Sequence, residues 1–90
     1  MVPLAHYTEK DAKRIGEILE IDWQVIPLPE FRRGLDVERE HGRIDPKTDV
    51  THDDDILTGK IALAHLNEYP DYYTRLDKME AEAEAYWKTK

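Results

Sequence analysis

The chain has no cysteine and no serine among its 90 residues. Without cysteine it has no disulfide, no thiolate metal ligand and no cysteine nucleophile. Without serine it also lacks the commonest hydroxyl nucleophile, and its threonines show no arrangement with a general base. The sequence therefore gives little support to an enzyme.

Basic charge is also scarce. Thirteen lysines and arginines stand against twenty aspartates and glutamates, for a formal net charge of −7, which opposes binding to nucleic acid or to anionic lipid. The N-terminus lacks the basic start and apolar run of a secretion signal, and no segment approaches the roughly 20 apolar residues of a membrane span. We therefore expect a soluble, cytoplasmic protein that binds neither nucleic acid nor membrane.

Helical periodicity is the main signal that the sequence contains. The hydrophobic content of 40%, without low-complexity tracts, fits one compact domain over residues 1–90. We expect residues 1–7 and 88–90 to be frayed ends. The predicted fold is all-α, a small bundle of about four helices with an ordered acidic loop between the second and the third.

The first two helices are bounded by capping residues, proline and glycine. Thr8 is predicted to begin the first helix, with Asp11 in a capping-box position. Pro27 and Pro29 interrupt this helical pattern, because proline removes an amide donor and disfavours helical geometry in the residue before it. Pro29 suits the start of the second helix, and Gly42 is expected to end it.

The third helix is predicted over residues 53–68, after a capping signature formed by Thr51 and Asp54. It is apolar almost all round, which predicts that it is the central helix. Gly59 is expected to be a close-packing point for another helix. Pro70 starts the fourth helix, whose apolar residues share one side: Tyr72, Leu76, Met79, Ala83, Tyr86 and Trp87.

The loop before the third helix is rich in acids: Asp45, Asp49, Asp53, Asp54 and Asp55. Hard cations such as calcium prefer several oxygen ligands, but this spacing is not that of an EF-hand. Acids near a helix start more commonly cap backbone amides and complement the helix dipole. We therefore interpret the acidic loop as a capping segment.

Acid and imidazole side chains are predicted to lie inside the bundle. At about 100° per residue, Glu38 and His41 share a face with the apolar residues of the second helix, whereas Asp36 lies on the outer face. His65 and Glu68 occupy a similar inner position on the third helix. Buried groups of this kind either satisfy one another in a hydrogen-bonded network or jointly bind a divalent ion, as Glu-x-x-His pairs do in some bundles.

Aromatic residues are the candidates for contact with a partner. Tyrosine and tryptophan are frequent in binding hot spots, and those not used by the core would be available for a protein partner or for self-association. The candidate interaction residues are Trp23, Tyr72, Tyr73, Tyr86 and Trp87.

Residues 31–83 resemble a family of small uncharacterised proteins from bacteria and their phages, described only as a domain of unknown function. The resemblance rests on the run GLDVEREHG, the loop DPKTDVTHDD and the segment TGKIALAHLNEYPDYYTRL. It implies a helical domain located in the cytoplasm of a bacterial or infected host cell. It implies no activity, ligand or catalytic residue.

Three functional hypotheses follow. The first is a small acidic helical module that binds a protein partner or forms a homo-oligomer. The alternative is a divalent-metal-binding protein that uses Glu38, His41, His65 and Glu68. A third, mimicry of nucleic-acid charge, fits the net charge but not the mixture of acids with lysines and arginines.

Overall fold

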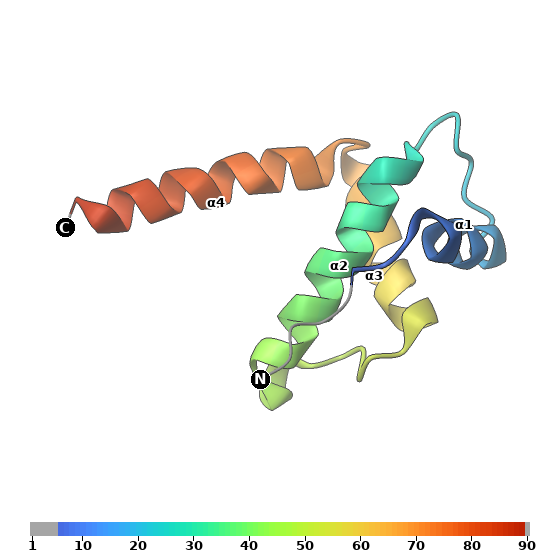
Figure 1. Ribbon diagram of the computed structural model, residues 1–90, viewed down its shortest axis with the longest axis horizontal. Coiled ribbons are helices and arrows are strands. Elements are labelled where there is room, and N and C mark those ends of the chain that lie inside the picture. The colour runs from blue at the N-terminus through green and yellow to red at the C-terminus, as the bar shows by residue number, and fades with distance from the viewer. Residues whose placement is uncertain (1–5, 90) are drawn as a thin grey trace.

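The structure, a computed structural model, describes residues 6–89. Within that range the chain forms four α-helices and one short 3₁₀ helix, and no strand (Figure 1). The elements are α1 (Glu9–Ile18), α2 (Leu28–Ile44), η1 (Pro46–Thr48), α3 (Asp55–Glu68) and α4 (Tyr72–Lys88). The predicted all-α class is confirmed, and none of the helices in this part of the chain is long and apolar enough to cross a membrane.

Helix α1 begins as its sequence predicts. The Asp11 amide donates to the Thr8 hydroxyl at 3.0 Å, and the Thr8 amide donates to the Asp11 carboxylate at 3.1 Å. This reciprocal capping box satisfies two amides at the helix start, and it holds the pKa of the Asp11 carboxyl below its usual value. Farther along the helix, Ala12 and Ile15 are fully buried.

Like α3, which was predicted to be central, α2 packs against the three other described helices. It has 17 residues, and Phe31 and Leu35 on its inner face are fully buried. Helix α3 is shorter, and Leu57 in its first turns remains 42% exposed. The central position predicted for α3 is therefore shared by α2 and α3.

Two glycines mark close approaches between segments. At Gly59 an added Cβ would lie 2.8 Å from Ile15 Cγ2 and 3.0 Å from Leu19 Cδ1, so the predicted helix crossing is confirmed. Gly42 was expected to end α2, but the helix continues to Ile44 and no described glycine has a positive φ. A Cβ at Gly42 would lie 2.9 Å from the side-chain oxygens of both Asp49 and Thr51. Gly42 therefore makes room for the returning loop.

The loop before α3 is built around capping contacts. The N-cap is Asp54, whose carboxylate accepts from two amides of the first turn at 2.9 Å, which confirms the capping interpretation at this residue. Thr51 does not cap the helix, because its side chain is buried against Asp49. The carboxylate of Asp53 instead accepts two hydrogen bonds from Arg43, one from Nε and one from Nη2, each at 2.8 Å.

The described residues nearest the chain ends make hydrogen bonds with the rest of the fold. Residues 1–5 and 90 lie outside the described part, so the expectation of fraying is untested there. Tyr7, however, is only 6% exposed, because its amide and hydroxyl both donate to buried or half-buried aspartates. Lys88 still belongs to α4, and the Thr89 hydroxyl donates to the carbonyl of Tyr86 at 2.8 Å.

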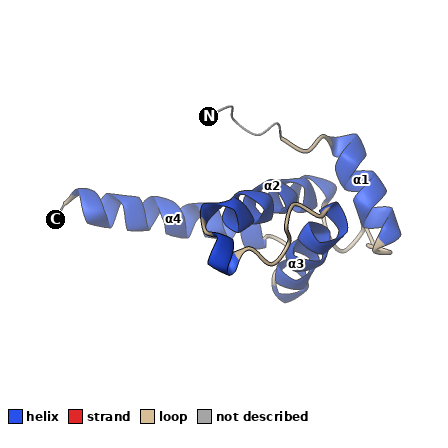
Figure 2. Cartoon of the chain, turned by 90° about the horizontal axis from the view of Figure 1, so that it is seen from below, coloured by secondary structure: helices blue, strands red, loops and turns tan. Residues whose placement is uncertain are grey.

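Helix α4 has two different surroundings along its length. Near its start Tyr73 is fully buried against the body formed by α1, α2 and α3. Beyond Leu76 every residue from 77 to 89 is exposed. Figures 1 and 2 both show α4 running away from the other three helices, so that the C-terminus lies far from the body.

Candidate functional site

A buried polar cluster joins α2, α3 and the first turn of α4. The Tyr73 hydroxyl donates to Glu38 Oε2 at 2.7 Å. The Nδ1 atom of His65 lies 3.1 Å from both Glu38 Oε2 and the Tyr73 hydroxyl. Glu38 is 8% exposed and Tyr73 is fully buried. Glu38 and His65, which were both predicted to face inward, are therefore brought together in a hydrogen-bonded cluster in which Glu38 is buried and His65 is half-buried.

The local sequence explains how this cluster forms. Glu38 follows Leu35 by one turn of α2, so the carboxylate emerges at the edge of the buried face. Gly34 precedes it on the same side, and an added Cβ there would overlap the Tyr73 ring. The absence of a side chain at Gly34 thus lets the tyrosine lie directly on α2, with its hydroxyl at Glu38.

Electrostatics explain why the carboxylate tolerates burial. A buried ion needs hydrogen-bond donors to replace water, and Tyr73 supplies one while a proton on His65 Nδ1 would supply another. Burial, and then the hydrogen bond to Glu38, raise the pKa of the Tyr73 hydroxyl above its usual value. The hydroxyl therefore stays protonated as a donor. The cluster thus links α2, α3 and α4 through hydrogen bonds between their side chains.

The outer edge of the cluster faces an open groove. The His65 ring stacks on Tyr72, with ring centroids 4.4 Å apart and planes 5° from parallel. The groove has a volume of about 360 Å³ and is lined by Val37, Glu38, His41, His65, Tyr72, Leu76 and Glu80. Only part of the cluster is thus reachable from solvent.

The other predicted metal ligands do not join the cluster. His41 was expected to point inward but is exposed at the groove, because α4 crosses α2 at a large angle and runs away from its C-terminal end (Figure 1). Glu68 is also exposed, at the last position of α3. Among residues 6–89 no group of three or more histidines, aspartates or glutamates is placed to hold a metal ion. The metal site stays a prediction that metal titration can test.

The five candidate interaction residues separate into two groups. Tyr73 is part of the core, and Tyr72 and Trp23 are half-buried against it; the Trp23 ring lies 5.9 Å from that of Phe31. Tyr86 and Trp87 are 53% and 70% exposed, and their rings meet edge to face at 5.1 Å. Two of the five therefore present large aromatic area to solvent.

An apolar hollow lies along the first half of α4. It has a volume of about 220 Å³ and is lined by Tyr69, Tyr72, Arg75, Leu76 and Met79. The Arg75 guanidinium lies over the Tyr69 ring at 4.4 Å. The hollow opens on the same side of the helix as Met79, which is 59% exposed.

A second polar cluster escaped the sequence analysis. Asp36 was placed on the outer face of α2 but is only 4% exposed, because the segment before α1 covers it. Its carboxylate accepts from the Tyr7 amide at 2.8 Å and lies 3.0 Å from His6 Nδ1. The Tyr7 hydroxyl donates to Asp55 at 2.7 Å, and burial together with this bond raises the pKa of Tyr7 to about 12. The helical periodicity of α2 cannot show that a segment from elsewhere in the chain covers its outer face.

One comparison with known proteins gave a match, to a protein family. A family described as "Protein of unknown function (DUF5661)" matches residues 12–82. The chain belongs to the DUF5661 family. The matched range of this DUF5661 protein contains Glu38, His65 and Tyr73 and ends before Tyr86 and Trp87. The expected resemblance to a domain of unknown function is confirmed. No curated protein and no solved structure matches the chain.

Proposed function

We propose that this chain is a helical interaction module that presents α4 to a protein partner. The observation that carries the proposal is the exposure of α4 beyond Leu76, where every residue is exposed and where Met79, Tyr86 and Trp87 are 59%, 53% and 70% exposed. Large apolar side chains gathered on one surface are typical of interaction sites.

The length of the projecting segment supports this proposal. Residues 77–88 add about three turns beyond the last half-buried position. Helices this short are marginal in water unless an apolar face packs on another surface. The alanines of this segment favour helix formation, but they do not explain the large apolar residues. A partner that covers those residues would stabilise the segment as a helix.

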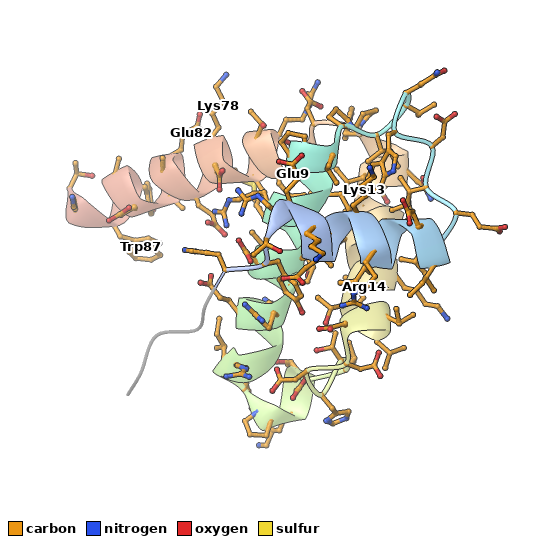
Figure 3. The ribbon with its side chains drawn as sticks, turned by 45° about the vertical axis from the view of Figure 1, so that its right-hand side comes forward. Glu9, Lys13, Arg14, Lys78, Glu82 and Trp87 are labelled. Carbon is orange, nitrogen blue, oxygen red and sulfur yellow. The ribbon has the colours of Figure 1, made fainter. Side chains whose placement is uncertain are left out.

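The apolar residues of α4, which are half-buried near its start and exposed farther along, form a stripe on one side of the helix. Tyr72, Leu76, Met79, Ala83 and Tyr86 follow one another at alternating intervals of four and three residues, which we call the α4 stripe. This spacing places them on one side of a helix and suits packing against a second helix. Trp87 flanks the stripe, and Figure 3 shows it on the side opposite Lys78 and Glu82.

The body of the protein fixes the direction of α4. Tyr73 is held by Glu38 and His65, and the Thr74 amide and hydroxyl both donate to Glu30 of α2 at 2.9 Å. Arg33 of α2 also pairs with Asp77 at 2.9 Å. A helix that is already oriented loses less entropy on binding. The polar cluster thus serves binding by positioning the helix.

Site-specific photocrosslinking tests this proposal. A photoreactive phenylalanine analogue is placed at Ala83, in the α4 stripe, or at Ala81, on the opposite side, in cells that naturally contain the protein. We expect a discrete crosslinked species from position 83 and little from position 81. Equal crosslinking at the two positions, or none at either, would contradict a binding role for the stripe.

A further inference from the structure

We propose that the partner of α4 is α4 of a second copy of this chain, packed antiparallel in a symmetric dimer. This inference rests on the proposed function, since it uses the same stripe. A two-fold interface requires a surface that is complementary to itself, and the sequence of α4 meets this requirement in both its apolar and its charged positions.

One antiparallel register satisfies both kinds of position. If Leu76 packs opposite the partner's Met79, then Tyr72 packs opposite the partner's Ala83, and the two-fold axis repeats both contacts. In helix pairs of this spacing the residues that flank the stripe also face each other across the interface. In this register Arg75 faces the partner's Glu82. Each copy supplies one cation and one anion, so the dimer contains two such pairs.

The neighbouring antiparallel register, shifted by one heptad, is disfavoured by charge. It keeps apolar contacts, because Ala83 then packs opposite the partner's Met79. It also brings Glu82 opposite the partner's Glu82 at the two-fold axis. Like charges in contact across an interface oppose association and suppress the wrong pairing. The positions of Arg75 and Glu82 therefore select one register.

The apolar hollow can accommodate the C-terminal end of the partner helix. In the selected register Tyr86 of the partner lies at the level of Tyr69, which lines the hollow of about 220 Å³ together with Tyr72 and Met79. The hollow is open on the side of the stripe, and the partner's aromatic ring would fill it. A parallel pair would instead leave the hollow without Tyr86, because equal positions would lie side by side.

The shape of the molecule suits the antiparallel arrangement. Helix α4 leaves the body on one side and its end lies far from the other helices (Figure 2). In an antiparallel pair the two bodies sit at opposite ends of the paired helices. The opposite directions also bring the negative end of each helix dipole near the positive end of the other.

A charge-exchange experiment on the purified full chain tests the register. Sedimentation equilibrium measures the dimer dissociation constant of the unaltered protein, of Arg75→Glu, of Glu82→Arg and of the variant with both changes. We expect each single change to weaken the dimer about tenfold, because it places like charges in both symmetric pairs. The double change exchanges the charges and should restore the dimer to within about threefold.

Matched controls lie on the outer side of the same helix. Lys78→Glu and Glu84→Arg make charge changes of the same size at positions away from the stripe, and we expect them to change the constant less than threefold. Loss of the Arg75 contacts with Asp71 and Tyr69 within one chain would not be restored by Glu82→Arg. Restoration therefore reports the contact between copies.

The outcomes separate this inference from the proposed function. A dimer that both single changes leave intact, or that the double change does not restore, overturns the register. A chain that remains monomeric at the highest concentration reached overturns the second copy as partner. In that case crosslinking from Ala83 to a different protein would leave the proposed function standing. A crosslink between two copies, from 83 and not from 81, supports both.

Discussion

The two parts of α4 carry the same apolar pattern but have different surroundings. From Tyr72 to Leu76 the stripe is half-buried, because one side of it rests on the body while the other side lines the apolar hollow, and Tyr73 beside it is fully buried. From Met79 to Trp87 the same kinds of side chain are exposed. The difference shows that an apolar face identifies a surface that packs, but not whether its partner lies in the same chain.

The cause of the difference is the direction of the helix. Tyr73 can approach α2 closely because Gly34 carries no side chain, and its hydroxyl then reaches Glu38. The crossing angle that results carries the rest of α4 away from the body (Figure 1). Changes at the crossing should therefore affect folding, and changes beyond it should affect association.

The largest effect is expected from Gly34→Ala. The added methyl group would overlap the buried Tyr73 ring, and such overpacking costs about 3 kcal/mol. Urea unfolding should show this loss of stability, and the release of α4 should appear as faster amide exchange in its first turns.

A smaller residue at position 73 provides the control. In a Tyr73→Leu background the overlap is removed, so the additional cost of Gly34→Ala should fall to below about 1 kcal/mol. If Gly34→Ala costs as much in that background as in the unaltered chain, the crossing is not limited by this contact.

A moderate effect is expected from Tyr73→Phe. The change removes the hydroxyl that donates to Glu38 at 2.7 Å, and loss of a buried donor to a carboxylate costs about 2 kcal/mol. Tyr72→Phe is the matched control on the neighbouring, half-buried ring and should cost less than about 0.5 kcal/mol. Similar losses for the two variants would show that the Glu38 bond does not stabilise the fold.

The same variant should change the alkaline pH dependence. The folded-state pKa values of Tyr7 and Tyr73 are raised above the ordinary 10.0, that of Tyr7 to about 12. A raised pKa stabilises the fold fully below pH 10, and the contribution is lost as pH rises through the folded value. Tyr73→Phe should make the decline above pH 10 shallower, as measured by chemical unfolding at a series of pH values.

The smallest effect on stability is expected from Met79→Lys. This side chain is 59% exposed, so the unfolding free energy of the dilute monomer should change by less than about 0.5 kcal/mol. Association through the α4 stripe should nevertheless be lost, as sedimentation would show. A large loss of monomer stability would mean that Met79 packs on the body, and the contrast between the two parts of α4 would fail.

Local signals predicted local structure well. Thr8 and Asp11 form the expected capping box, and Gly59 lies at the expected helix crossing. The inward positions of Glu38 and His65 followed from two helical periods, although only the structure shows that these two side chains pair. These predictions succeeded because each depends on the geometry of a single helix or on side chains that share one buried face.

Predictions failed where a distant segment decides the environment. Asp36 lies on the outer side of α2 by periodicity, yet Tyr7 and His6 cover it. His41 lies on the inner side, yet α4 runs away from it and leaves it exposed. Gly42 resembles a helix stop, yet the returning loop requires its small size.

The sequence by itself determined the all-α class, most of the helix starts and the faces on which apolar residues gather, because these depend on hydrogen bonding and periodicity over a few residues. Only the tertiary structure decided that α2 shares the central position with α3, which acids are buried and which part of the α4 stripe remains exposed. The reason is that burial depends on where a second segment lies, and the crossing of α4 over Gly34 sets that position for the whole C-terminal helix.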